Sequence, residues 1–250
     1  MPENSRLLIV NPNASSGITD ALAAMAARRM PGLQIEKLTL DDAPSYIESP
    51  AQLARQLERI CRAIALRRGD FDLTLVGCFS GWDRAGAGAD LPPACTLADT
   101  CLAMLGLRGR PFSIVTGGSC WREPIVELVQ AMGFAHLVRS VRVSELNAQE
   151  VLAGGDAGMQ AFRALLQATA REDGVETILL GGAGFVGQTA AFSAGLPCQL
   201  LDCGEVCVAA IEALLKVAKK IPPMPAQESG PAHDQGGLPE VVRDAPARCP

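Results

Sequence analysis

Residues 74–81 read TLVGCFSG, so an apolar run ends at Cys78 and small polar residues follow it. A thiol at the end of a buried strand is well placed for chemistry, because parallel strands bring their carboxyl ends to the ligand-binding edge of a sheet. The alternative for Cys78 is simple burial as a small core residue. The position favours a thiol that acts as an acid or a base.

Acid/base work by Cys78 requires a thiol that ionises near neutral pH. The pKa of a free cysteine is about 8.5, and nearby N–H groups or positive charges lower it. We expect the backbone N–H groups of the FSG segment after Cys78 to lower its pKa. The two histidines offer no help, since His136 precedes a strand on the far side of a sheet and His233 lies in a Pro- and Gly-rich tail.

Composition excludes several classes of function. The 250-residue chain carries a net charge of −5, which argues against nucleic-acid binding, and no apolar run approaches the ~20 residues that span a bilayer. The N-terminus lacks the pattern of a signal peptide, so we expect a cytoplasmic protein with reduced cysteines. Cys198, Cys203 and Cys207 lack the spacing of a metal site, and we expect no metal.

Strand-like and helix-like segments alternate, which predicts an α/β fold with parallel sheets covered by helices. Thr19 and Ser49 are the expected N-caps of the first two helices, and Pro50 is suited to the first helical position. The strands are expected at 6–10, 33–40, 71–77, 112–116, 137–143, 176–181 and 197–202. The helices are expected at 19–30, 49–69, 123–133, 157–174 and 203–221.

The chain contains an internal repeat. Aligning LLIVNPN with FSIVTGG places Asn11 on Thr116, and aligning DLTLVGCFSG with ETILLGGAGF places Cys78 on Gly182. The two offsets differ by one residue, which predicts two pseudo-symmetric half-domains with an active-site cleft between them. We expect all four residues to line this cleft. The expected limits are 1–100 plus 203–221 for the first half-domain, 101–202 for the second, and 222–250 for a flexible tail.

These stretches resemble the aspartate/glutamate/hydantoin racemase superfamily, and most of all its hydantoin racemase branch. The matching segments are LLIVNPNASSGIT, DFDLTLVGCFS, LRGRPFSIVT and LLGGAGFVG, in family order, over about residues 6–220. The resemblance implies a cofactor-independent enzyme in which two cysteines face each other across the cleft. One removes a proton from a carbon next to a carbonyl, and the other returns a proton on the opposite face. Small residues after each cysteine offer N–H groups to the developing oxyanion.

The chain departs from the family at the second cysteine, where it has Gly182. The loop after Cys78, with Trp82, Asp83 and Arg84, also differs and is expected to reshape the pocket. Two-base racemisation then needs water or another group, for which Cys120 is a candidate second acid/base. One-faced chemistry is the alternative, since the superfamily includes arylmalonate decarboxylases with a single cysteine, at the second position.

The expected substrate is a small carboxylate or carbonyl compound, and a homo-oligomer fits the resemblance. A non-catalytic paralogue that binds a small carboxylate or a partner protein remains the alternative from another class. GGAGFVG also suggests a nucleotide loop, but it lacks the Walker lysine. The expected substrate-binding residues are Asn11, Phe79, Ser80, Thr116, Gly117, Gly181, Gly182, Ala183 and Gly184.

Overall fold

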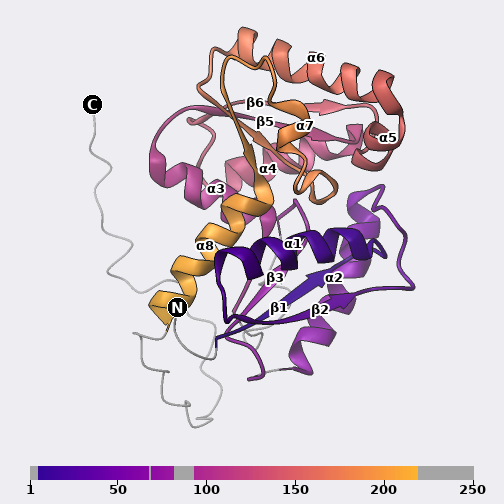
Figure 1. Ribbon diagram of the computed structural model, residues 1–250, viewed down its shortest axis with the longest axis vertical. Coiled ribbons are helices and arrows are strands. Elements are labelled where there is room, and N and C mark those ends of the chain that lie inside the picture. The colour runs from indigo at the N-terminus through magenta and orange to yellow at the C-terminus, as the bar shows by residue number, and fades with distance from the viewer. Residues whose placement is uncertain (1–4, 68, 82–92, 219–250) are drawn as a thin grey trace, which may run out of the picture.

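The computed structural model describes residues 5–67, 69–81 and 93–218. It contains two four-stranded parallel sheets flanked by helices, which form the lower and upper halves of the molecule in Figure 1. The first sheet has the order β2-β1-β3-β4, formed by β1 (Arg6–Asn11), β2 (Gln34–Thr39), β3 (Leu73–Val76) and β4 (Ala94–Thr96). The second has the order β6-β5-β7-β8, formed by β5 (Phe112–Gly117), β6 (Val138–Ser144), β7 (Thr177–Leu180) and β8 (Gln199–Asp202). The α/β class with two parallel sheets is confirmed.

The two sheets repeat each other strand for strand. The N–H of Gly77 donates to the carbonyl of Val10 at 2.8 Å, and the N–H of Gly181 donates to that of Val115 at the same distance. Each bond joins the residue after the third strand of a sheet to the first strand. The residues that follow, Cys78 and Gly182, therefore occupy equivalent places in the two halves, as the sequence repeat predicts.

Helices cover both sheets, and the helix signals in the sequence have mixed outcomes. Ser49 caps its helix as expected, since its hydroxyl accepts the N–H of Gln52 at 3.2 Å. The Thr19 assignment is wrong, because the first helix already begins at Ser16 and the buried Thr19 hydroxyl bonds to that of Thr39 instead. The longer helices are α1 (Ser16–Arg29), α2 (Pro50–Ala65), α3 (Leu97–Arg108), α4 (Arg122–Ala131), α6 (Gly155–Asp173) and α8 (Cys203–Ala218). The short ones are η2 (Ser119–Trp121), α5 (Ala148–Ala153), η3 (Ala183–Phe185) and α7 (Thr189–Phe192).

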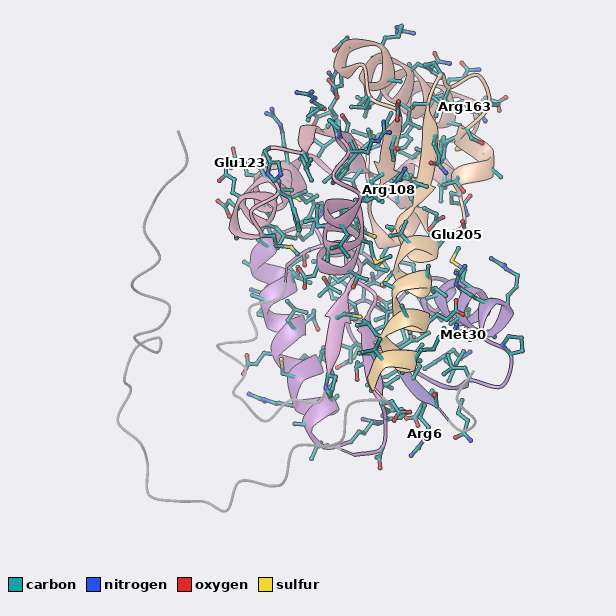
Figure 2. The ribbon with its side chains drawn as sticks, turned by 90° about the vertical axis from the view of Figure 1, so that its left-hand side faces the viewer. Arg6, Met30, Arg108, Glu123, Arg163 and Glu205 are labelled. Atoms are coloured by element: carbon teal, nitrogen blue, oxygen red, sulfur yellow. The ribbon has the colours of Figure 1, made fainter. Side chains whose placement is uncertain are left out.

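One hydrophobic core runs through both halves. It contains Leu7 of β1, Ile114 of β5 and Ile211 of α8, each fully buried. Helix α8 starts at the second sheet and packs on α1 of the first half and on α3, which connects the two halves. Figure 2 shows this course, with Glu205 near the start of α8, Met30 beside its lower part and Arg6 below its end. The halves are therefore held together as one folded unit, and the domain limits, one of which falls within α3, stay a prediction.

Two segments named in the sequence predictions lie outside the described residues. They are the loop with Trp82, Asp83 and Arg84, and the tail 222–250 with His233. In the part of the chain that is described, none of the helices combines the length and the apolarity needed to cross a membrane.

Candidate active site

A cavity opens between the carboxyl ends of the two sheets. Its empty volume is about 660 Å³, including space open to solvent. From the first half, Cys78 and Phe79 border it at the end of β3. From the second half, it is bordered by Thr116 and Gly117 at the end of β5, and by Gly182, Ala183 and Gly184 after β7. The structure thus brings together seven of the residues that the sequence singles out.

The Cys78 thiol is held in a defined position at the cavity. Its backbone N–H donates to the carbonyl of Val76 at 2.7 Å, and its carbonyl accepts the N–H of Leu97, the first residue of α3, at 3.0 Å. Its sulfur shares a hydrogen bond of 3.1 Å with the hydroxyl of Ser80. The residue is only 9% exposed. The end of β3 and the start of α3 therefore fix the thiol where a ligand in the cavity reaches it.

Burial raises the pKa of the Cys78 thiol to about 11. The hydrogen bonds from Ser80 act in the opposite direction but are the smaller influence, and the negative charge of Asp99 adds to the rise. Among the described residues that line the cavity there is no charged side chain to offset the loss of solvation. The backbone N–H of Ser80 does lower the thiol pKa as expected, but burial outweighs it, and Cys78 carries its proton at neutral pH.

This pKa predicts an unusual alkylation profile. We expect iodoacetamide to modify Cys78 slowly at neutral pH and about tenfold faster for each pH unit up to about 11, because only the thiolate reacts. Ser80→Ala removes a hydrogen bond that favours the thiolate, so it should move the profile to higher pH. Peptide mass spectrometry after timed alkylation measures the rate at each cysteine.

Cys120 is the internal control for alkylation, since its side chain is exposed. Burial accounts for the slow reaction of Cys78. The exposed Cys120 should therefore be alkylated faster than Cys78 at every pH below about 11. A midpoint for Cys78 below the ordinary range of cysteine, or an unchanged profile in Ser80→Ala, would contradict the assignment of burial and Ser80 as the opposing influences.

The second cysteine position of the family has a backbone that suits only glycine. Gly182 has a φ of +100°, a value that side chains rarely adopt. A Cβ atom built on it would lie 2.8 Å from the Thr116 hydroxyl oxygen and 3.4 Å from the Phe185 ring. The hydroxyl of Thr116 thus occupies the space where a side chain at residue 182 would begin.

Thr116 is buried to 3% exposure, yet its hydroxyl has no hydrogen-bond partner among the described residues. It borders the cavity at the end of β5. Its oxygen is not among the fully buried polar atoms without a partner, a group that within the described residues holds Thr74 alone, so it stays open to the cavity. This hydroxyl is therefore available to bind a ligand from the second half, as the sequence predicts for Thr116.

The asparagine at the cavity is Asn13, not the expected Asn11. The Asn11 side chain is fully buried and is used within its own turn, where it donates to the carbonyl of Ser15 at 2.8 Å and accepts the N–H of Asn13 at 3.2 Å. Asn13 borders the cavity. Asn11 therefore shapes the loop that presents Asn13 to the cavity. The segment NPN contains both asparagines, so the sequence already offered Asn13 as an alternative candidate.

Three further sequence candidates lie away from the cavity wall. Ser80 acts on the thiol rather than lining the cavity. Gly181 makes room for Phe79, whose ring carbon would lie 2.6 Å from a Cβ at residue 181. Cys120 is exposed and borders a different surface hollow with Arg122 and Arg142, so the structure does not support it as a second acid/base.

Sequence reasoning missed the residues that close the cavity from flanking loops and helices. Tyr46 lies in the loop between β2 and α2, Trp121 in η2 and Gln149 in α5. Their signal in the sequence is weak, because no repeat or strand end marks these positions. The missed apolar lining is formed by Ile18, Ile47, Leu53, Ile125, Ala148 and Phe185. Within the described ranges no group of three or more His, Cys, Asp or Glu side chains is arranged to hold a metal ion.

The family model for Asp/Glu/Hydantoin racemase matches residues 7–211. The chain belongs to this family. A hydantoin racemase of Paenarthrobacter aurescens is 26% identical over 221 residues, which cover 86% of this chain and 90% of that protein. Membership confirms the resemblance noted in the sequence and places the protein in a family of isomerases with small-molecule substrates.

Solved structures share the fold. The allantoin racemase of Pseudomonas fluorescens has a TM-score of 0.76 and 22% identity, over 85% of this chain and 91% of that one. A liganded double mutant of arylmalonate decarboxylase has a TM-score of 0.59 and 14% identity, over 86% of this chain and 93% of that one. Both racemases and a decarboxylase therefore use the arrangement of sheets described above.

Proposed function

We propose that this protein is a cofactor-independent enzyme that transfers a proton at a carbon next to a carbonyl, with Cys78 as its single acid/base and without a second ionisable group at residue 182. Its substrate is a small carboxylate or carbonyl compound. The observation that carries the proposal is the asymmetry of the cavity, which has a protonated thiol at the end of β3 and a glycine at the equivalent place after β7.

A thiol that keeps its proton at neutral pH is suited to donate it. In a decarboxylase-like reaction the bond between the α-carbon and the leaving carboxylate breaks, carbon dioxide departs, and the electron pair enters an enediolate. The proton of the Cys78 S–H group then forms the new C–H bond, and the thiolate takes a proton from water. The raised pKa supports this role of Cys78 as a general acid over that of a base.

The opposite wall of the cavity supports one-faced chemistry. Gly182 has no proton to give, and the Thr116 hydroxyl next to it is far too weak an acid or base to replace a cysteine. Hydrogen bonding to substrate oxygen is the role that suits Thr116, together with N–H groups of the segment Gly182–Gly184. Such donors stabilise the charge that develops on oxygen as the enediolate forms. We therefore favour a decarboxylase-like reaction over two-faced racemisation.

The test is the stereochemistry of proton delivery in deuterium oxide. Arylmalonates with a second α-substituent and substituted hydantoins are incubated with the protein, and products are separated by chiral chromatography and analysed by mass spectrometry. We expect α-deuterated product of a single configuration from a malonate, or exchange without inversion in a hydantoin, because Cys78 serves one face only. A racemic deuterated product would contradict one-faced chemistry.

The non-catalytic paralogue has one observation in its favour, which is that a thiol with a pKa of about 11 is a poor base. A non-catalytic role predicts that the same malonates and hydantoins bind to the protein without exchange of hydrogen for deuterium. If these compounds bind and protect Cys78 from alkylation while no deuterium enters any of them, the binding role replaces the catalytic one.

A further inference from the structure

The loop between β2 and α2 crosses from the first half of the molecule to the second. Its Ser45 carbonyl accepts a hydrogen bond from Gln149 Nε2 of α5 at 3.2 Å. Its Tyr46 hydroxyl oxygen accepts one from Trp121 Nε1 of η2, also at 3.2 Å. The loop belongs to the first half by sequence, but its tip is attached to two elements of the second half at the edge of the cavity.

Gly118 allows the Tyr46 hydroxyl to come unusually close to the second sheet. A Cβ atom at residue 118 would lie 2.6 Å from this hydroxyl, and Gly118 has a φ of +89° that favours glycine. Gly118 directly follows Thr116 and Gly117, which line the cavity at the end of β5. The hydroxyl of Tyr46 therefore lies beside the wall that the second half contributes to the cavity, across from Cys78.

The Tyr46 hydroxyl has an unused donor. Its oxygen accepts from Trp121, while its own hydrogen has no acceptor among the described residues, and Tyr46 borders the cavity. A hydroxyl that accepts a hydrogen bond donates a stronger one, because the two bonds polarise each other. Trp121 therefore both fixes the direction of the tyrosine and strengthens it as a donor toward the cavity.

We propose that Tyr46 donates a hydrogen bond to a carbonyl or carboxylate oxygen of the substrate, so that the substrate is bound between Cys78 on one side and Tyr46 with Thr116 on the other. This inference rests on the proposed function and identifies one of its binding groups. The compound it fits has such an oxygen next to an apolar arm, which contacts Ile47 and Leu53 of the cluster that also contains Cys78. The bond strengthens as negative charge develops on that oxygen.

Tyr46 is the only tyrosine in the chain, which makes the proposal measurable without turnover. Protein labelled with ¹³Cζ-tyrosine gives a single tyrosine signal by NMR. We titrate it with phenylmalonate and with 5-benzylhydantoin, and follow protection of Cys78 from alkylation in the same samples. We expect the probe that protects Cys78 to shift the Tyr46 signal, because its oxygen accepts the phenolic hydrogen.

Tyr46→Phe removes the hydroxyl and keeps the ring, and Ser45→Ala is the matched control because that exposed side chain makes no bond across the cleft. We expect Tyr46→Phe to weaken probe binding, measured by calorimetry, about ten- to hundredfold, and Ser45→Ala to leave it unchanged. If a probe protects Cys78 while the signal stays in place and Tyr46→Phe binds equally well, the Tyr46 proposal fails and the proposed function stands. If neither probe protects Cys78 or moves the signal, both fail for these compounds.

Discussion

Replacing Cys78 by serine is expected to reduce turnover by about 10²- to 10⁴-fold, which is the range that a positioned acid/base contributes. Serine keeps the size and the hydrogen bond to Ser80, but its hydroxyl releases a proton far less readily than a thiol does. Substrate binding should remain, because the lining of the cavity is otherwise intact. Rates in deuterium oxide and affinities by calorimetry separate these two effects.

Cys120→Ser is the matched control for this substitution. It makes the same chemical change at an exposed thiol that borders another hollow, so turnover should stay at the level of the unmodified protein. If Cys78→Ser keeps full turnover, another group transfers the proton. If both variants lose activity equally, the loss reflects the fold rather than the chemistry, and unfolding curves of the two variants distinguish that case.

The pH dependence of turnover follows from the same thiol. As a general acid, Cys78 works in its protonated form, so the rate should be flat across neutral and mildly alkaline pH and fall only as the pH rises toward about 11. As a general base it would show the reverse, a rise of about tenfold per pH unit below that value. The direction of the profile therefore tells donation from removal of a proton.

Much of the fold follows from local patterns in the sequence. The strands of both sheets except β4 were signalled by short apolar runs, and α2 was signalled by its cap Ser49 with Pro50 after it. Strand β4 has only three residues and gives little pattern. Helix α3 had a readable signal that was not used, since Thr96 caps it and Leu97, Cys101 and Leu105 recur four residues apart. A threonine before an apolar run imitates an N-cap, which is why Thr19 is misassigned; the N-cap position belongs to Ser15, which makes no side-chain cap hydrogen bond.

The internal repeat predicts the candidate site, because the residues that it aligns lie at the ends of strands. Cys78, Thr116 and Gly182 all lie where parallel strands finish, so the sequence brings them to one edge of each sheet. Tyr46 and Trp121 meet only because two connecting segments from different halves fold over that edge. No pattern within either segment specifies such a contact, because it depends on how the two halves pack.

Electrostatics were the least predictable part of the site. The sequence shows which polar groups follow Cys78, and these do lower the pKa of its thiol as expected. It does not show how completely the thiol is removed from water, and this burial is the larger influence. The protonation state, and with it the choice of acid over base, therefore required the packed structure.

Replacing Gly182 by alanine is expected to destabilise the protein by about 1–3 kcal/mol, because its φ of +100° is strained for any residue with a Cβ. The 2.8 Å approach of that Cβ to the Thr116 hydroxyl adds to the cost. For a chain of this size the melting temperature should fall by about 2–4 °C per kcal/mol. Gly17→Ala is the matched control, since that glycine of α1 has an ordinary φ and a Cβ there would meet no packed neighbour within 4 Å, so it should melt at or slightly above the temperature of the parent.

Thr116→Ala separates the two causes of this strain. If the hydroxyl contributes, Gly182→Ala should cost less stability in the Thr116→Ala background than in the parent, and the difference measures the coupling.

Gly182→Cys should likewise destabilise the fold and should not convert the protein into an efficient two-base racemase, because Thr116 and the backbone both displace the new thiol. Rapid racemisation of a hydantoin by a Gly182→Cys protein of unchanged stability would show that the second face tolerates a cysteine after all. The loss of the second cysteine would then be a simple substitution, rather than a change to which Thr116 and the backbone are adapted.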